Sequence, residues 1–498
     1  GEAEVLNNLG NAYRHLGQNE KAINFYQQSL PIKQELKDRE QEALVLIALG
    51  LAYYSLGQHE TAINFYQQSL PIKQELKDRE GEAITLSNLG FAYNNLGQYE
   101  RAINFYQQSL PIYQELKDRK GEADVLNILG VAYNHLGQYE TAIDVLQKSL
   151  PIYQELKDRK WEVNALKELG FAYHNLGQHK TAIDVLQQSL PIYQELKDRE
   201  AEAYVLNNWG RAYNSLGQYK KAIDVLQQSL PIYQELKDRQ GEAEVLMFLS
   251  SAYLSQRQYG KVINFSQQSL PIFREIKDRK REAIVLNLLG VTYHFLRQYE
   301  KMINSYQQSL PIWQELKDRK WEADVLKSLG LAYKSQRQYE KAINSYQLSL
   351  LIYRELKDRK GEASVLQESL PICRKLKNRE WEASVLLNLG VIYKSLGQYK
   401  KAISFLQKSL PIYQEIKNRE GEVHVLKNLG LAYKSQRQYG KAINSYQESL
   451  VIFFQESITP EGEGHSWVNL GNTCNFLGEY EEAINFYQQS LEIAKKTD

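Results

Sequence analysis

The hydrophobic positions of this chain recur with helical spacing inside a phrase of 40 residues. We number the positions of this phrase, its phases, from 1 to 40, so that Leu6 and Leu46 share phase 6. Leu, Leu, Tyr and Leu at phases 6, 9, 13 and 16 form one helical stripe. Phases 22, 23, 26, 30, 33 and 36 form a second stripe, after a Gly at phase 17 that predicts a turn. Each phrase therefore predicts a helix hairpin, with helix A over about phases 2–16 and helix B over about phases 19–37.

The phrase extends through nearly the whole chain. Nine copies fill residues 1–360, half a copy fills residues 361–380, and three copies, the last of them divergent, fill residues 381–498. Because neither helix can bury its stripe alone, the hairpins are expected to stack into one solenoid. The half copy joins the start of helix A to the end of helix B, which predicts one continuous helix and a stacking fault. It is either a tolerated loss of half a repeat or a hinge between two binding surfaces.

Proline interrupts helix B at one phase. Ten of the 11 prolines, beginning with Pro31 and Pro71, lie at phase 31. A proline inside a helix removes one backbone hydrogen bond and costs roughly 3 kcal/mol unless the helix bends. We expect a bend in each helix B near phases 27–31, or a break in which the Ser at phase 29 caps a second segment.

Small residues lie where the two helices of a hairpin are expected to cross, with Gly at phase 10 and Ala at phase 22. In order and spacing, the first copy resembles the signature of the tetratricopeptide repeat family through Leu9, Gly10, Tyr13, Gly17, Ala22 and Tyr26. The period of 40 exceeds the usual value of about 34 and is similar to that of kinesin light chain, of Pins/LGN-type adaptors and of bacterial arrays. The resemblance implies an all-α fold, a right-handed α-solenoid of stacked antiparallel hairpins, that binds proteins in a concave groove.

Composition narrows the function further. With 61 Lys+Arg against 60 Asp+Glu, a general electrostatic attraction to nucleic acid or to anionic membranes is not implied, and we expect neither as a partner. Two Cys exclude a disulfide scaffold and favour a reducing, cytoplasmic compartment. The phosphate-loop, C-x-x-C, H-E-x-x-H and G-x-S-x-G motifs are absent from the sequence. We expect no catalytic residues, no metal and no cofactor.

By the resemblance, the groove is lined by phases 4, 7, 8, 11 and 14 of helix A, a spacing that forms one helix face. These phases vary between copies, as ligand-facing or merely solvated positions would. Asn recurs there, and its amide both donates and accepts hydrogen bonds, which suits the backbone of an extended peptide. The expected ladder consists of Asn7, Asn88, Asn94, Asn127, Asn134, Asn207, Asn214 and Asn287.

Apolar and basic side chains complete the expected groove. Phe91 and Phe171 at phase 11 are either ligand pockets or packing between helices. Towards the C-terminus the same face becomes basic, which favours an acidic peptide or a terminal carboxylate, with solvated surface lysines as the alternative. The lysines are Lys327, Lys334, Lys394, Lys427 and Lys434.

The sequence thus predicts a non-enzymatic scaffold that holds a peptide or protein segment in its groove. The alternative keeps the fold and makes the chain the sensor or regulatory arm of a larger bacterial signalling protein, with a CHAT protease, a STAND NTPase or a kinase outside this sequence. A start without Met and an end without a polar capping helix motivate the alternative. The oligomeric state is left open.

Overall fold

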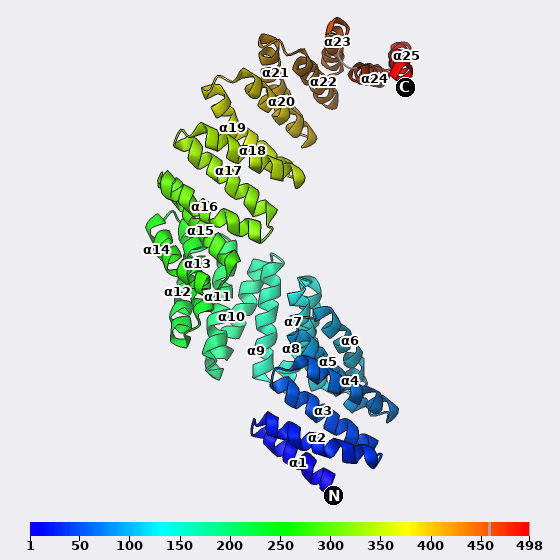
Figure 1. The fold of residues 1–498 in the computed structure, drawn as a ribbon, viewed down its shortest axis with the longest axis vertical. Helices are drawn as coiled ribbons and strands as arrows, with labels where there is room; N and C mark the ends of the chain where they lie inside the picture. Colours follow the sequence, from blue (N-terminus) through cyan, green and yellow to red (C-terminus); the bar gives the residue numbers. More distant parts are fainter. Residues whose placement is uncertain (457–459, 498) are drawn as a thin grey trace. The chain divides into compact units, whose positions relative to one another are not determined.

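The computed structural model describes residues 1–456 and 460–497, and every regular element among them is an α-helix (Figure 1). Two compact units, Gly1–Gln258 and Tyr259–Asp498, each consist of stacked helix hairpins. The helices of the first unit are α1 (Glu2–His15), α2 (Asn19–Glu35), α3 (Arg39–Ser55), α4 (His59–Glu75), α5 (Arg79–Asn95), α6 (Tyr99–Leu116), α7 (Arg119–His135), α8 (Tyr139–Leu156), α9 (Arg159–Asn175), α10 (His179–Leu196), α11 (Arg199–Ser215), α12 (Tyr219–Leu236) and α13 (Arg239–Ser255).

The second unit continues the alternation of helices A and B. Its helices are α14 (Tyr259–Glu275), α15 (Arg279–Phe295), α16 (Tyr299–Glu315), α17 (Arg319–Ser335), α18 (Tyr339–Glu355), α19 (Arg359–Lys375), α20 (Arg379–Ser395), α21 (Tyr399–Glu415), α22 (Arg419–Ser435), α23 (Tyr439–Glu456), α24 (Pro460–Leu477) and α25 (Tyr480–Thr497). The predicted all-α solenoid of helix hairpins is therefore confirmed.

Helix A begins earlier than predicted, at phase 39 in most copies. The reason is the acidic residue at phase 38, whose carboxylate accepts a hydrogen bond from the backbone three residues later, as Asp78 does from the Gly81 amide at 2.9 Å. At its other end helix A stops at the predicted turn. Gly17 adopts a left-handed conformation with φ of 73°, and Arg297 at the same phase adopts it with φ of 56°.

The close crossing within each hairpin is confirmed by the glycine at phase 10. A Cβ added to Gly90 would lie 2.4 Å from the ring of Tyr106 at phase 26, so any larger residue would clash. One copy replaces both members of this pair with a smaller combination, Ser250 and Ser266, and both serines are fully buried. The two phases therefore share one fixed volume of the core.

The predicted break at proline is wrong. Each helix that contains a phase-31 proline runs through it without interruption, as α2 does through Pro31. The Ser at phase 29 caps nothing; it is buried, and in several hairpins its hydroxyl donates to helix A of the same hairpin. Ser29 Oγ bonds the Ala3 carbonyl at 2.7 Å, and Ser409 Oγ bonds the Ala383 carbonyl at 2.8 Å. The predicted bend stays a prediction.

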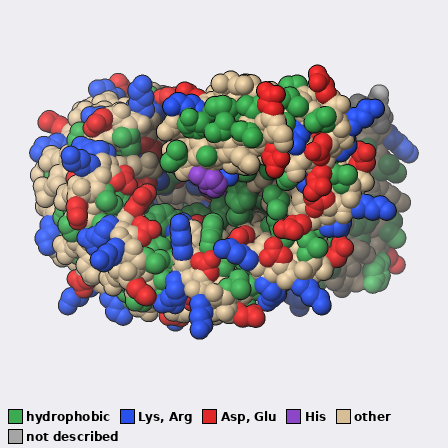
Figure 2. Space-filling model, turned by 90° about the horizontal axis from the view of Figure 1, so that it is seen from below, with side chains coloured by type: hydrophobic (Ala, Val, Ile, Leu, Met, Phe, Trp, Pro, Cys, Tyr) green, Lys and Arg blue, Asp and Glu red, His purple; other side chains and the backbone are tan. Residues whose placement is uncertain are grey.

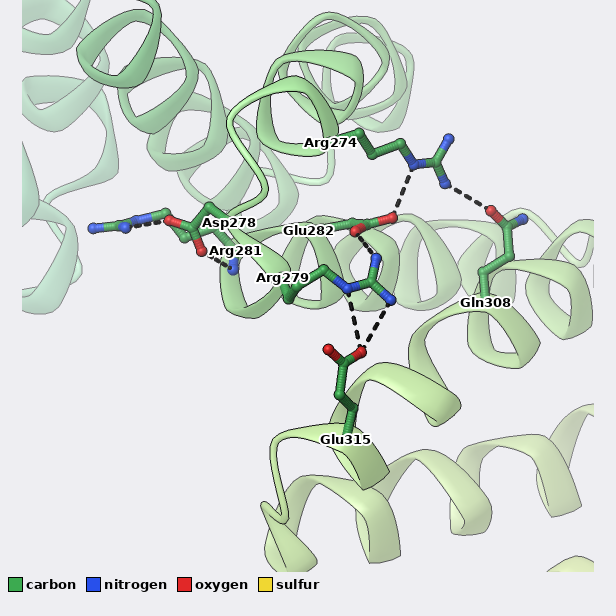
Figure 3. A network of polar contacts seen from close by, with 7 residues as sticks. All are labelled: Arg274, Asp278, Arg279, Arg281, Glu282, Gln308 and Glu315. Carbon is green, nitrogen blue, oxygen red and sulfur yellow. Dashed lines mark hydrogen bonds and ion pairs between the residues drawn. The ribbon is translucent and has the colours of Figure 1, made fainter.

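Where one repeat meets the next, charged residues of the template form a recurring network (Figure 3). Glu282 is 4% exposed and accepts a hydrogen bond from Arg274 Nε at 2.9 Å, and it also pairs with Arg279. Arg279 reaches on to Glu315 of the following helix B at 3.4 Å. Equivalent contacts in the first unit join Arg79, Glu82 and Glu115. This network explains why Glu recurs at phases 2 and 35 of the repeat and Arg at phase 39.

The half copy forms the single helix α19, as predicted. Its first half makes the contacts of a helix A. Asp358 caps the helix by accepting from the Gly361 amide at 2.9 Å, and Glu368 pairs with Lys334 of α17. Asn134 of α7 and Glu168 of α9 make the same contact between consecutive helices A.

The second half of α19 makes the contacts of a helix B with α20. Gln367 Nε2 donates to the Tyr393 hydroxyl at 2.7 Å, a contact that recurs between helix B and the next helix A throughout the array. Arg374 Nε donates to Glu382 at 2.8 Å, as Arg274 does to Glu282. One helix therefore serves as helix A towards the preceding repeat and as helix B towards the following one.

Candidate functional site: the exposed faces of the helices A

The accessible face of helix A passes through phases 4, 8, 11 and 15. On α17 these are Asp324, Ser328 and Leu331, which are half-buried, and Ser335, which is exposed. Phase 14 lies half-buried at the edge of this face in most copies, and phase 7 is usually covered by the neighbouring repeat. We call the side chains at phases 4, 8, 11, 14 and 15 of neighbouring helices A in one unit an A wall, and we name each wall by its helices.

Several asparagines of the expected ladder join neighbouring helices. Asn127 is fully buried and donates to Asn164 Oδ1 of α9 at 3.1 Å. Asn134 is buried and donates to the carboxylate of Glu168 at 3.2 Å and to its carbonyl at 3.1 Å. Two further members, Asn207 and Asn287, are also buried. In this structure these four side chains have almost no surface accessible to a ligand.

The remaining asparagines stay on the surface in part. These half-buried members are Asn7, Asn88, Asn94 and Asn214. Asn88 and Phe91 share a pocket of about 150 Å³ in the first unit with Ile84, Ser87, Tyr113, Gly121, Asp124, Val125, Ile128 and Trp161. Phe171 is half-buried and packs edge-on against Tyr139, with ring centroids 6.4 Å apart.

The two sequence-predicted lysines of α17 are neutralised by acidic neighbours. Lys327 Nζ lies 3.2 Å from the Asp324 carboxylate on the same helix. Lys334 pairs with Glu368 of α19, which acts as the next helix A. These two cations therefore already have counter-charges within the protein.

The lysines of α20 and α22 lie in a different environment. Lys394 Nζ donates to Asn428 Oδ1 at 2.7 Å, and Lys434 Nζ lies 5.1 Å from the centroid of the Phe476 ring. No carboxylate lies within ion-pair distance of Lys394, Lys427 or Lys434 among the described residues. Burial lowers the pKa of all three ammonium groups, because a half-buried cation loses hydration.

Lys394 and Lys434 line the same pocket, which has a volume of about 480 Å³. The other lining residues are Tyr399, Leu431, Ser435, Tyr439 and Phe476. The site thus combines two cations that have no acidic partner in the described part of the chain with aromatic side chains, of which Tyr439 stacks on Phe476 with centroids 6.4 Å apart. Such a site can take a negatively charged group beside an apolar one.

Sequence reasoning missed the aromatic part of this pocket. Tyr399 and Tyr439 lie at phase 19, just past the A–B turn, and Phe476 takes the place of phase 15 in the divergent last copy. The signal was present as a pairing of aromatic residues at phases 19 and 15 of consecutive copies. Tyr99 stacks on His135 in this way, with centroids 4.6 Å apart.

In the part of the chain that the structure describes, three side chains gather as possible metal ligands: Cys474, Glu479 and Glu482. Burial and the two carboxylates raise the pKa of the Cys474 thiol to about 11, so the group stays protonated at neutral pH. A metal needs the thiolate, and this arrangement therefore does not favour a metal site.

On the face shown in Figure 2, Lys and Arg side chains alternate with Asp and Glu side chains, without an extended area of one sign. This distribution agrees with the even charge balance of the sequence. Of the helices described, none has the length and apolar character needed to cross a membrane.

The family model described as tetratricopeptide repeat matches this chain along most of its length. The matched residues are 1–75, 56–115, 81–155, 121–195, 161–235, 199–275, 281–355, 364–415 and 419–496. A comparison with curated proteins gives no match.

Solved structures with a similar fold include three repeat proteins. The tetratricopeptide-repeat sensor protein of the STAND class from Pyrococcus horikoshii is 16% identical, with a TM-score of 0.51 over 69% of this chain and 55% of that chain. The apo form of RapI is 17% identical, with a TM-score of 0.46 over 56% of this chain and 99% of that chain. A putative kinesin light chain from Podosopora anserina is 21% identical, with a TM-score of 0.35 over 39% of this chain and 95% of that chain.

With the family model matched along most of the sequence and the predicted hairpins present in both units, the chain belongs to the tetratricopeptide-repeat family.

Proposed function

We propose that this protein is a non-enzymatic interaction scaffold that binds extended protein segments along its A walls, and that the wall of α20, α22 and α24 selects acidic segments. The observation that carries the proposal is the pocket of Lys394 and Lys434 beside Tyr399, Tyr439 and Phe476. These two half-buried cations have no acidic partner among the residues that the structure describes. Repeat proteins of this family bind proteins or peptides, which supports the general part of the proposal.

Both ammonium groups of this pocket belong to half-buried side chains. Partial burial removes water from Lys394 and Lys434, and the lowered pKa of each group records that loss. A Glu or Asp side chain, or a terminal carboxylate, restores a charge-assisted hydrogen bond at this site. The apolar lining favours a segment in which the acidic residue alternates with an aliphatic or aromatic one.

The walls elsewhere favour different segments. The wall of α17 has lysines that already pair with Asp324 and Glu368, and its phase-11 residue is the apolar Leu331. In the first unit, the pocket of Asn88 and Phe91 is lined mainly by apolar and aromatic side chains, and its charged lining residue is the acidic Asp124. We expect these walls to favour neutral, apolar segments.

The test uses a fluorescein-labelled peptide of alternating Glu and Leu, with a peptide of alternating Lys and Leu as the charge control. We expect the acidic peptide to bind the parent chain and to lose at least about tenfold in affinity, about 1.4 kcal/mol, on Lys394→Ala with Lys434→Ala. The matched control, Lys327→Ala with Lys334→Ala, should change the affinity by less than about threefold. Fluorescence anisotropy measures both. Equal losses in the two variants, or no binding to the parent, would contradict the proposal.

The alternative function, a sensor or regulatory arm of a larger signalling protein, is favoured by the likeness to the STAND sensor, which is a likeness of fold. The A wall would then receive the signal segment and transmit its binding to an effector domain. The reading frame around this sequence decides between the two. An adjoining protease, NTPase or kinase domain supports the regulatory arm, and its absence favours the free-standing scaffold.

A further inference from the structure

The half copy reverses the direction of the helices A within the second unit. Arg319 near the start of α17 pairs with Glu355 at the end of α18 at 2.6 Å, so these helices are antiparallel. Leu376, just after α19, lines one pocket with the first residues of α18, so α19 is antiparallel to α18. Arg374 near the end of α19 bonds Glu382 near the start of α20 at 2.8 Å. Each helix is antiparallel to the helix before it. Elsewhere consecutive helices A are two helices apart and therefore parallel. Here α20 lies three helices after α17, so these two helices A are antiparallel.

Because α19 acts as helix A towards α17 and as helix B towards α20, the A walls before and after it lie on opposite sides of the stacked helices. Glu368, on the accessible side of α19, pairs with Lys334 of α17, so this side continues the A wall of α15 and α17. Towards α20, however, α19 is a helix B. The residues equivalent to Glu368 and Pro371 on the next helix B are Lys408 and Pro411 of α21, and both lie on its exposed outer side. The side of α19 that carries Glu368 thus continues the A wall of the preceding repeats, and in the following repeats the same side is the exposed side of the helices B.

We infer that the second unit takes two separate protein segments, one on the wall of α15 and α17 and one, acidic, on the wall of α20, α22 and α24, and that one extended segment does not follow both. This inference rests on the proposed function. The two occupants differ in chemistry because the lysines of α17 pair with carboxylates, whereas those of α20 and α22 pair with none of the described carboxylates.

The geometry can be tested without a ligand, by cysteine cross-linking at phase 15. Ser335, Ser395 and Ser435 are exposed and end three helices A. Ser395→Cys with Ser435→Cys places two thiols on one wall, and a short bis-maleimide should join them. Ser335→Cys with Ser395→Cys places them at opposite ends of antiparallel helices, separated by about 25 Å, one helix length, and should not cross-link. Cys373 and Cys474 are buried, and their thiol pKa values are raised to about 12 and about 11, so they stay unreactive.

A matched deletion restores the alternation. Removing residues 361–380 joins two whole copies, so that every helix A of the unit runs in one direction. In this variant the pair Ser335→Cys and Ser395→Cys lies on adjacent repeats and should cross-link. Circular dichroism checks that the shortened chain keeps its helicity. Should it fail to fold, the two cysteine pairs in the full chain still decide.

The ligand test uses a photoreactive twenty-residue peptide of alternating Glu and Leu, which reaches up to about 66 Å when extended. In the full chain we expect adducts on α20, α22 and α24 and none on α17. In the deletion variant the adducts should extend to α17.

Adducts on both walls of the full chain, or a cross-link between positions 335 and 395 in it, would overturn the inference and leave peptide binding intact. An absence of adducts together with the expected cysteine pattern would overturn the proposed function and, with it, the assignment of two segments, while the opposed geometry would stand.

Discussion

The walls of α17 and of α20 with α22 have lysines at the same phases of the repeat and differ in what surrounds them. On α17, Lys334 pairs with Glu368, and on α20 the equivalent Lys394 meets the neutral amide of Asn428. The partner comes in both cases from the next helix A, 34 residues along the chain. A basic residue at a given phase therefore becomes a candidate anion site only when its neighbour one repeat later leaves it without a counter-charge.

The largest expected effect comes from reversing the charge of the unpaired wall. Lys394→Glu with Lys434→Glu should weaken binding of the acidic Glu-Leu peptide by about a hundredfold or more, because like charges then meet in a partly buried pocket. The basic Lys-Leu peptide should bind this variant better than the parent. Anisotropy titrations with both peptides measure the exchange of preference. A variant that keeps its preference for the acidic peptide would place that peptide elsewhere.

The paired wall should become an anion site when its own acid is removed. In the background of Lys394→Ala with Lys434→Ala, the change Glu368→Gln frees Lys334 and should recover about three- to tenfold of the lost affinity for the acidic peptide. Glu340→Gln, on the exposed start of α18, is the matched control and should recover nothing. If both changes act alike, net charge rather than local pairing governs binding.

The dependence on pH should differ between the walls. The acidic peptide needs charged lysines, and the pKa values of Lys394 and Lys434 are lowered. Its affinity for the parent should therefore be constant near neutral pH. The affinity should fall as the pH rises through the lowered pKa values of the two lysines. This fall should come at a lower pH than the titration of an ordinary lysine, whose pKa is about 10.4. Titrations at increasing pH measure this, and an affinity that falls only with the titration of ordinary lysines would argue against the pocket.

Folding stability responds to the same shifts with the opposite sign. Between the lowered pKa of the folded state and the ordinary value, the unfolded chain binds more protons at these lysines than the folded chain does. Their contribution to the free energy of unfolding therefore increases with pH across that window. Urea unfolding of the parent and of Lys394→Ala with Lys434→Ala, compared across the window, isolates this contribution.

The smallest effect concerns the amide that accepts from Lys394. Asn428→Ala removes this acceptor, so the ammonium group has more to gain from a carboxylate of the ligand. Affinity for the acidic peptide should increase by about two- to threefold. The matched change Asn388→Ala, whose side chain donates to the Ser384 carbonyl of its own helix, should leave the affinity unchanged.

Most of the fold could be predicted from the sequence because the repeat displays its pattern many times. The stripes, the turn at phase 17, the close crossing at phase 10 and the single helix of the half copy all follow from local spacing. Two features depended on more than local spacing. The start of helix A is set by the cap at phase 38, and the phase-29 serine hydrogen-bonds to its own hairpin partner in several hairpins instead of capping a break.

The candidate site was less predictable, because spacing places residues on a helix face without showing which part of that face a neighbour covers. Asn127 shares a face with accessible positions and is fully buried against the next repeat, where it donates to Asn164. The pocket at Lys394 and Lys434 needs Tyr399 and Tyr439 from the turns and Phe476 from the divergent last copy. These residues meet only when consecutive repeats are stacked.

The most direct test of the central claim is the reactivity of the individual lysines towards an acylating reagent, measured by mass spectrometry with and without the acidic peptide. The neutral amine attacks the reagent, so Lys394 and Lys434, with lowered pKa values, should react faster than an ordinary lysine in the free chain. The peptide should protect these two and leave Lys327 and Lys334 unchanged. Equal protection of all four lysines, or protection of the α17 pair alone, would contradict an acidic segment on the wall of α20, α22 and α24.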